Sequence, residues 1–178
     1  MEQLYLLVPP EPKKNAMELK EIKLKIAVYN SSDELTAEDA ALLSVARDTA
    51  KFAYAPYSRF FVGAAATLAN GKTVTGTNQE NASYPVGICA ERVLLSAVAS
   101  QYPGEAVNTM AISYSNENGE SVKPISPCGI CRQTLVEYEY RTKTSIRIIL
   151  SGMSGEVFVI ETAKQLLPLS FTADDLHV

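Results

Sequence analysis

Apolar and polar residues follow two different periods along this chain, and the changes of period predict the order of its elements. Apolar residues recur at every second position over residues 22–28, which is typical of a half-buried strand. From Thr36 to Phe52, alanine and leucine recur at helical spacing, and Thr36 with Asp39 resembles the capping box that begins a helix. Pro56 prevents an extension of this helix. The first part of the pattern thus predicts a strand and then a helix.

The middle of the chain predicts a hairpin and then helices that alternate with strands. We expect strands over residues 60–68 and 72–77, joined at Asn70-Gly71, because this dipeptide suits a type I′ turn with positive φ at both positions. The remaining predicted elements lie over residues 88–99 (helix), 107–114 (strand), 128–140 (helix), 146–150 and 157–160 (strands) and 162–167 (short helix). This order predicts an α/β domain, in which helices pack on a sheet.

The composition and charge of the chain exclude several classes of protein. The 178 residues, 47% hydrophobic and 20% charged, make one domain with about 30 residues to spare. That balance excludes a disordered chain and a coiled coil, and it leaves enough apolar material for a sizeable core. The formal net charge of −4 argues against a protein that binds a phosphate backbone by charge, so we expect no nucleic-acid partner.

The apolar run at residues 4–8 does not change this interpretation. It lacks the basic start and the length of a signal peptide, and a membrane span needs about 20 apolar residues. Three cysteines are also too few, and odd in number, for a disulfide framework, which favours a reducing compartment. We therefore expect a cytoplasmic protein with no membrane partner.

The scarce residues narrow the possible chemistry. The chain holds three cysteines, a single histidine (His177) and no tryptophan. Because His177 is the last residue but one, imidazole is nearly excluded as a catalytic base or a metal ligand. Any hydrolytic chemistry must then run on carboxylates, thiols or a metal ion that these groups hold.

The cysteines stand at the starts of two predicted helices. Cys89 is followed two residues later by Glu91, and Cys128 and Cys131 form a C-x-x-C motif behind a proline. Alone, a cysteine is most often a small core residue, and a C-x-x-C motif can be a thiol redox pair. Together the three thiols can bind one zinc ion and leave its fourth position open, as in catalytic zinc sites. Glu91 is then placed to move the proton of a water molecule.

The combination C-A-E and P-C-x-x-C resembles the zinc-dependent nucleoside and nucleotide deaminases, whose signature is H-x-E…P-C-x-x-C with cysteine allowed in place of histidine. Further blocks at residues 54–65, 76–84 and 166–176 narrow the resemblance to the small, homotetrameric type of cytidine deaminase. The resemblance extends from about residue 37 to residue 177. It implies a three-layer α/β/α fold with a mixed sheet of about five strands, over residues 36–178.

The resemblance also implies an activity and its parts. We expect hydrolytic deamination of cytidine and 2′-deoxycytidine to the uridines and ammonia, in pyrimidine salvage. One Zn²⁺ per subunit would be held by Cys89, Cys128 and Cys131, and Glu91 would pass the proton of water to N3 and help protonate the departing amine. The partner is then a nucleoside, and neighbouring subunits of a homotetramer would complete each site.

Further residues acquire roles in the same way. Asn78 and Glu80, two apart in an extended segment, correspond to the positions that bind the ribose 3′-hydroxyl. Phe60, Tyr84 and, from a neighbouring subunit, Phe171 correspond to residues that line the base pocket. A zinc ion with three thiolates carries a net negative charge, which needs an offset before bound water is acidified. The two helix N-termini and Arg92 can provide that offset.

Two matters stay open at this point. Residues 1–35 are an extension beyond the resemblance, and their predicted strand at 22–28 would add either to the sheet edge or to a subunit contact. The substrate can also be another small nucleoside, as in a blasticidin-type deaminase, although the Asn78 and Glu80 pair favours a ribose. A catalytically silent zinc module is the remaining alternative, and it would predict the loss of Glu91 or of a ligand, all of which are present.

Overall fold

The computed structural model describes residues 17–176 of the chain. The apolar run at residues 4–8 and His177, which entered the sequence arguments, lie outside these described residues. Within residues 17–176, no helix is both long enough and apolar enough to cross a bilayer.

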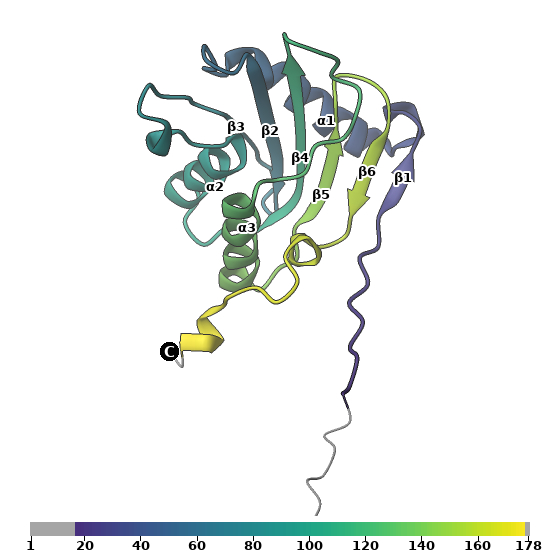
Figure 1. Cartoon of the computed structure of the whole chain (residues 1–178), viewed down its shortest axis with the longest axis vertical. Helices are drawn as coiled ribbons and strands as arrows, with labels where there is room; N and C mark the ends of the chain where they lie inside the picture. The colour runs from purple at the N-terminus through teal and green to yellow at the C-terminus, as the bar shows by residue number, and fades with distance from the viewer. Residues whose placement is uncertain (1–16, 177–178) are drawn as a thin grey trace, which may run out of the picture.

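One mixed sheet of six strands forms the centre of the molecule (Figure 1), in the order β1-β6-β5-β4-β2-β3. β4 and β5 pair in parallel, and all other neighbours in the sheet are antiparallel. The strand bounds are β1 Ala27–Tyr29, β2 Phe60–Leu68, β3 Thr73–Thr77, β4 Val107–Asn116, β5 Arg147–Ser151 and β6 Val157–Ile160. The helix bounds are η1 Ser32–Glu34, α1 Ala37–Thr49, η2 Ala50–Phe52, η3 Tyr84–Val86, α2 Ala90–Gln101, α3 Gly129–Thr142, η4 Ala163–Leu166 and η5 Ala173–Leu176.

Helices cover both faces of this sheet. α1 packs on one face, where Leu43 meets Ala65 and its neighbours, whereas α2 and α3 pack on the other, where Leu94 and Leu135 meet Ala64 and its neighbours. Figure 1 shows α1 behind the sheet and α2 and α3 in front of it. A strand buried on both faces needs no polar alternation, which explains the continuous apolar sequence of β2. The expected three-layer α/β/α class is therefore confirmed.

The sheet has one strand more than the expected number of about five, because the N-terminal segment adds β1 to the edge beside β6. The predicted strand over residues 22–28 was too long, since only Ala27–Tyr29 forms a ladder. β6 is short, and its residues Val157–Val159 face Tyr29–Ala27, so residues before Ala27 have no partner strand. Ile22 and Leu24 accordingly stay exposed, at 60% and 47%.

The hairpin between β2 and β3 has the predicted strands but a different turn. Gly71 has a φ of 79°, whereas Asn70 is not among the residues with positive φ. The amide of Gly71 donates to Leu68 O at 3.0 Å, and the amide of Leu68 donates to Lys72 O at 2.9 Å. The loop therefore spans three residues, 69–71, with glycine in the left-handed position, and the expected type I′ turn was wrong.

The predicted start of α1 is confirmed at its first hydrogen bond. Thr36 Oγ1 accepts from the amide of Asp39 at 3.2 Å, as an N-cap residue should. The Asp39 side chain completes no capping box. Its Oδ1 accepts instead from Arg147 Nη1 on β5 at 2.6 Å, which joins the start of α1 to the sheet.

Candidate active site

Three sulfur atoms meet where α2 and α3 begin. Cys89 is the N-cap of α2, Cys128 is the N-cap of α3, and Cys131 lies in the first turn of α3. The Sγ atoms of Cys89 and Cys128 are 3.7 Å apart, those of Cys128 and Cys131 are 3.5 Å apart, and all three atoms lie within 4.8 Å of one another. The two helix N-termini place partial positive charge beside these sulfurs.

A close approach of helix and sheet sets the position of this cluster. Gly76 of β3 lies directly under the first turns of α2, so that a Cβ there would come within 2.5 Å of Ala90 O. Only glycine lets α2 begin this near to the sheet. Cys89 and Glu91 are consequently held on a helix start that is packed against β3.

The donor set of the cluster fits a zinc ion. The three cysteines are free, and their sulfur separations far exceed the bond of about 2.05 Å in a disulfide. A redox pair needs only two thiols, whereas the third sulfur here completes a compact soft donor set of the kind zinc prefers. The chain therefore provides three ligands for zinc.

The pKa values of Cys89 and Cys131 shift in opposite directions. Hydrogen bonding by the Cys131 thiol lowers the pKa of Cys89 to about 6, and the positive charge of Arg92 contributes to this shift. The same interaction with Cys89, together with burial, raises the pKa of Cys131. One sulfur of the cluster is thus ready to bind a cation as a thiolate at neutral pH.

Glu91 is a buried carboxyl group next to this cluster. It lies in the first turn of α2 with a side chain that is only 5% exposed, and it lines a cavity together with Cys89 and Cys128. Burial raises the pKa of Glu91 above its ordinary value. A carboxyl group with a raised pKa can accept and return a proton near neutral pH, which is what a general acid–base residue must do.

The cavity has a volume of about 330 Å³ and connects the cluster with the polar residues predicted to bind a sugar. Its lining includes Val62, Asn78, Gln79, Glu80, Tyr84, Ile88, Cys89, Glu91, Ile125, Ser126 and Cys128. This volume suits a small molecule. Among the described residues, no lysine or arginine lines it, so it offers no charged partner for a phosphate group.

Asn78 and Glu80 are both at the cavity, and backbone contacts fix both. Asn78 Oδ1 accepts from the amide of Val62 at 2.7 Å, and its Nδ2 donates to Phe60 O at 2.9 Å. Glu80 Oε2 accepts from the amides of Tyr57 at 2.9 Å and Ser58 at 3.3 Å. A hydrogen bond from the Ser58 side chain lowers the pKa of Glu80, so this carboxylate stays ionised as an acceptor.

The three aromatic residues that were predicted to line the base pocket lie in different parts of the structure. Tyr84 lines the cavity, is 76% exposed and contacts Tyr57 edge to face, with ring centroids 6.0 Å apart. Phe60 is not among the lining residues and instead stacks on Tyr114 at 4.7 Å. Phe171 lies in the C-terminal tail, 59% exposed, and does not line the cavity of its own chain.

Three residues near the site had no role in the sequence arguments. Arg132 Nε donates to Pro127 O at 2.8 Å, which holds the residue before Cys128, and Gln133 Nε2 donates to Phe171 O at 2.7 Å. In the sequence, the indication for Arg132 and Gln133 was that they directly follow Cys131, a predicted zinc ligand. Arg59 has a φ of 57° and so turns the chain next to the amides that bind Glu80, for which the sequence offered no signal.

Comparisons with known proteins agree on one family. The sequence model described as cytidine and deoxycytidylate deaminase zinc-binding region matches residues 36–146. The chain is 36% identical to a cytidine deaminase of Halalkalibacterium halodurans over 125 residues, 70% of this chain and 87% of that protein. It is 26% identical to the blasticidin-S deaminase of Bacillus cereus over 140 residues, 78% of this chain and 95% of that protein.

Solved structures give the same result. The crystal structure of cytidine deaminase from Burkholderia pseudomallei matches with a TM-score of 0.65 and 38% identity, covering 77% of this chain and all of that one, 100%. The structure from Mycobacterium tuberculosis matches with a TM-score of 0.57 and 33% identity, covering 74% and 94% of the two chains.

Proposed function

Because this chain belongs to the family of cytidine and deoxycytidylate deaminases, we propose that it is a zinc-dependent hydrolase that converts cytidine and 2′-deoxycytidine to the corresponding uridines and ammonia. The observation that carries this proposal is the cavity itself. One of its ends holds the buried Glu91 beside three clustered sulfurs, and its other end holds Asn78 and Glu80.

In this proposal, the three cysteines bind the metal and Glu91 transfers the protons. Zinc, when bound by Cys89, Cys128 and Cys131, supplies the Lewis acid that activates water. Glu91 takes one proton from the attacking water and delivers it to N3 of the base. It then moves the second proton of that water, now on the hydroxyl at C4, to the amine, which leaves as ammonia while the C4 carbonyl forms. Its burial supports this role, since a raised pKa lets one carboxyl group both accept and donate.

The other end of the cavity binds the sugar in this proposal. The Glu80 carboxylate, kept ionised by its hydrogen bonds, accepts from the ribose 3′-hydroxyl, and Asn78 assists with the amide proton that Phe60 O leaves free. A lining without lysine or arginine, within the described residues, favours a neutral nucleoside over a nucleotide.

The binding end also gives reason to expect more than one chain. Tyr84 at the cavity mouth and Phe171 in the tail are exposed aromatic side chains, at 76% and 59%. We infer that a second copy covers them, within a homotetramer that works in pyrimidine salvage in the cytoplasm. The mass of the protein in solution tests the assembly, and a monomer at the concentrations used in the assay would contradict it.

The activity is tested by the fall in absorbance as cytidine becomes uridine. Cytidine, 2′-deoxycytidine, cytosine, 2′-deoxycytidine 5′-monophosphate and blasticidin S are assayed in parallel, with and without a zinc chelator. Turnover of the two nucleosides that the chelator abolishes is the expected result. Turnover of blasticidin S alone would favour the other nucleoside activity, and no turnover of any compound by the zinc-loaded protein would leave a silent zinc module.

The role of Glu91 is tested separately by Glu91→Gln, which preserves shape and removes the proton carrier. We expect a loss of about 10²–10⁴ in kcat with zinc content unchanged. The matched control is Glu120→Gln, an exposed glutamate in the turn after β4, which should leave kcat unchanged. Wild-type turnover in Glu91→Gln would contradict the assignment.

A further inference from the structure

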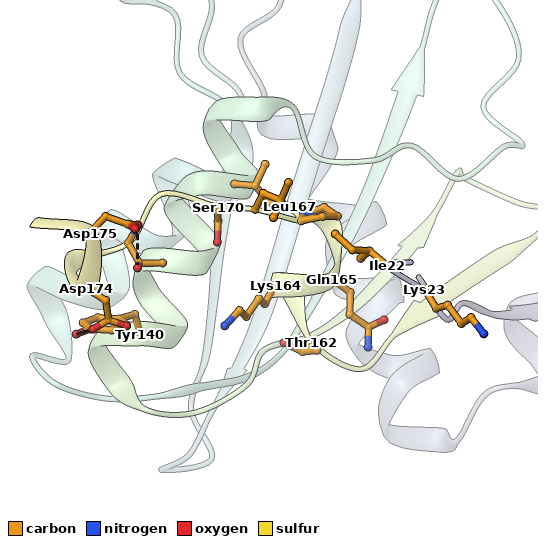
Figure 2. Close-up of a pocket in the computed structure, with 13 residues that line it drawn as sticks. Ile22, Lys23, Tyr140, Thr162, Lys164, Gln165, Leu167, Ser170, Asp174 and Asp175 are labelled. Carbon is orange, nitrogen blue, oxygen red and sulfur yellow. Dashed lines mark hydrogen bonds between the residues drawn. The ribbon is translucent and has the colours of Figure 1, made fainter. Parts of the chain in front are cut away.

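Within residues 17–176, cavities lie at both ends of α3, and they differ in whether they contain residues of the proposed reaction. The larger, of about 590 Å³, lies near the end of α3, where Figure 2 shows Tyr140 and Gln165 beside it. Its lining includes no cysteine and neither Asn78 nor Glu80. The smaller cavity reaches Cys128, the N-cap of α3, and includes Glu80. Nucleoside affinity therefore depends on what holds Glu80 in the wall of the smaller cavity.

Two successive backbone amides of the loop before β2 hold the Glu80 carboxylate. The amides of Tyr57 and Ser58 both donate to Glu80 Oε2, at 2.9 and 3.3 Å. Successive amides in a turn form a concave site for an anion, and the amide of Arg59 closes this turn by donating to Ala55 O at 3.0 Å. Oε1 of Glu80 receives no hydrogen bond from the described backbone, so it keeps its acceptor capacity for a ligand.

The shape of this loop requires an uncommon backbone conformation at Arg59. Its φ of 57° lies in the left-handed region, which residues other than glycine rarely adopt. Such a conformation persists only where its surroundings hold it. The Arg59 side chain pairs with Glu117 Oε2 at 3.4 Å, but both side chains are more than half exposed, so this ion pair contributes little. Contacts to the backbone of the loop must therefore hold it.

Two residues of the turn after β4 bind the carbonyl groups on either side of the Arg59 Cα atom. Asn118 Nδ2 donates to Ser58 O at 3.0 Å, and the amide of Glu117 donates to Arg59 O at 3.0 Å. The second contact is made by the backbone and does not depend on the side chain at position 117. The first contact comes from a side chain, so it depends on asparagine at position 118.

The turn that carries Asn118 is itself held in place. Asn116, the last residue of β4, pairs with Phe60 in the sheet, which brings the turn beside the loop. Asn116 Oδ1 accepts from the amide of Asn118 at 3.0 Å, and the amide of Asn116 donates to Ser121 Oγ at 2.8 Å. The side chain of Asn118 therefore reaches Ser58 O from a backbone whose place is fixed.

We propose that Asn118 is a positioning residue for the nucleoside. By holding Ser58 O, its side chain keeps the two loop amides on Glu80 Oε2 and leaves Oε1 to accept from the ribose. The inference rests on the proposed function, in which Glu80 binds the 3′-hydroxyl group. Asn118 is exposed and does not line the cavity, so any effect it has on the nucleoside must pass through the loop and Glu80.

The first test removes the donor of Asn118 and keeps its backbone hydrogen bond. Asn118→Ala is compared with the wild type and with Asn108→Ala, the same change at an exposed position of β4. We expect amide hydrogen exchange at residues 57 and 58 to quicken about three- to tenfold, and KM for cytidine to rise about two- to fivefold. Zinc content and kcat should change less than about twofold, which a general loss of structure would not permit.

Asn118→Gln keeps an amide donor on the exposed turn, so it should restore most of the exchange protection and of KM. Unchanged exchange or an unchanged KM in Asn118→Ala would overturn the proposal, and so would a loss of zinc in step with KM. A wild-type protein that fails to deaminate cytidine would contradict the proposed function alone. The exchange at residues 57 and 58 would still decide whether Asn118 holds the loop at Glu80.

The second test asks whether Asn118 acts through Glu80. Glu80→Ala removes the carboxylate that the loop amides hold, so in this variant Asn118 has no acceptor for the ribose to position. Asn118→Ala is therefore made in the wild type and in Glu80→Ala, and we expect the additional rise in KM in the double variant to be less than about 1.5-fold. A rise in KM by the same factor with and without Glu80 would overturn the proposal.

Discussion

The two ends of the proposed active-site cavity are built in different ways. At the metal end, Cys131 is fully buried and Glu91 is 5% exposed, on helix starts that pack against the sheet, whereas Cys89 is half-buried and Cys128 is exposed toward the cavity side. At the binding end, Tyr84 is 76% exposed at the start of the short helix η3, and its contact Tyr57 is 49% exposed in the loop before β2. A single chain therefore completes the chemical end and leaves the binding end open. Chemistry needs fixed geometry in a site that excludes water, and in the proposed assembly a neighbouring copy would cover the open end.

Removal of one buried sulfur should have the largest effect on the metal end. Cys131→Ser should reduce bound zinc from one ion per chain to well under half, and activity by more than about 10³-fold, because two thiols and a hydroxyl bind zinc far more weakly than three thiols. Zinc is measured by elemental analysis of the purified protein, and activity by the absorbance assay.

Exposed Ser126→Ala, at the rim of the same cavity, is the control for the cysteine variant and should retain zinc. Full zinc occupancy in Cys131→Ser would mean that the metal end is not built on the three sulfurs. The metal end would then not differ from the binding end in the way described above.

The two carboxyl groups of the cavity should separate when pH is lowered. Burial raises the pKa of Glu91, so it loses its negative charge first and kcat should fall about tenfold per pH unit below that pKa. Hydrogen bonding from Ser58 lowers the pKa of Glu80, so its carboxylate persists to lower pH and KM should stay flat over the same interval. Steady-state kinetics between about pH 5 and 8 measure both.

Zinc content after each incubation distinguishes this effect from loss of the metal. If KM rises before kcat falls as the pH decreases, the order of the two carboxyl groups is reversed and their assigned roles are wrong. Either result shows which end of the cavity limits the enzyme in acid.

The residues of the metal end could be predicted from the sequence more completely than those of the binding end, for a physical reason. Cys89, Cys128 and Cys131 stand at helix starts, where short-range spacing fixes geometry, so the motif already predicts the cluster. Phe60 stacks on Tyr114, a contact between strands that are far apart in the sequence and that no short-range spacing predicts, and its role in the base pocket stays a prediction. Phe171 lies in the C-terminal tail and does not line the cavity of its own chain, so its proposed role needs a second chain, which no pattern within one chain encodes.

The same distinction applies to the fold. The helices and strands follow local periodicity, and their order was predicted well from residue 36 onward. The N-terminal strand was overestimated because alternation over residues 22–28 shows only that a strand is possible, and its length depends on how far β6 extends beside it. The type of turn at Asn70-Gly71 likewise depends on how the two strands pair. Because Leu68 bonds to Lys72, the loop between them has three residues, and a two-residue type I′ turn does not form.

At the binding end, Glu80→Gln should raise KM for cytidine about tenfold and change kcat much less. A hydrogen bond to a charged acceptor contributes about 1.5–3 kcal/mol, and the amide retains only part of it. Glu120→Gln again serves as the exposed control. A fall in kcat equal to the change in kcat/KM would place Glu80 with the chemistry, which would remove the division between the two ends.

The smallest expected effect concerns Arg92, whose proposed role is to offset the charge of the thiolates. In the described structure Arg92 donates no hydrogen bond to the cysteine sulfurs, yet its charge helps lower the pKa of Cys89, so it acts through space. Arg92→Gln should reduce kcat, or the zinc retained against a chelator, about three- to tenfold, whereas Arg92→Lys should stay close to wild type because it keeps the charge. Equal losses in both variants would show that guanidinium geometry is required. Wild-type behaviour of Arg92→Gln would leave the helix N-termini as the only offset at the metal end.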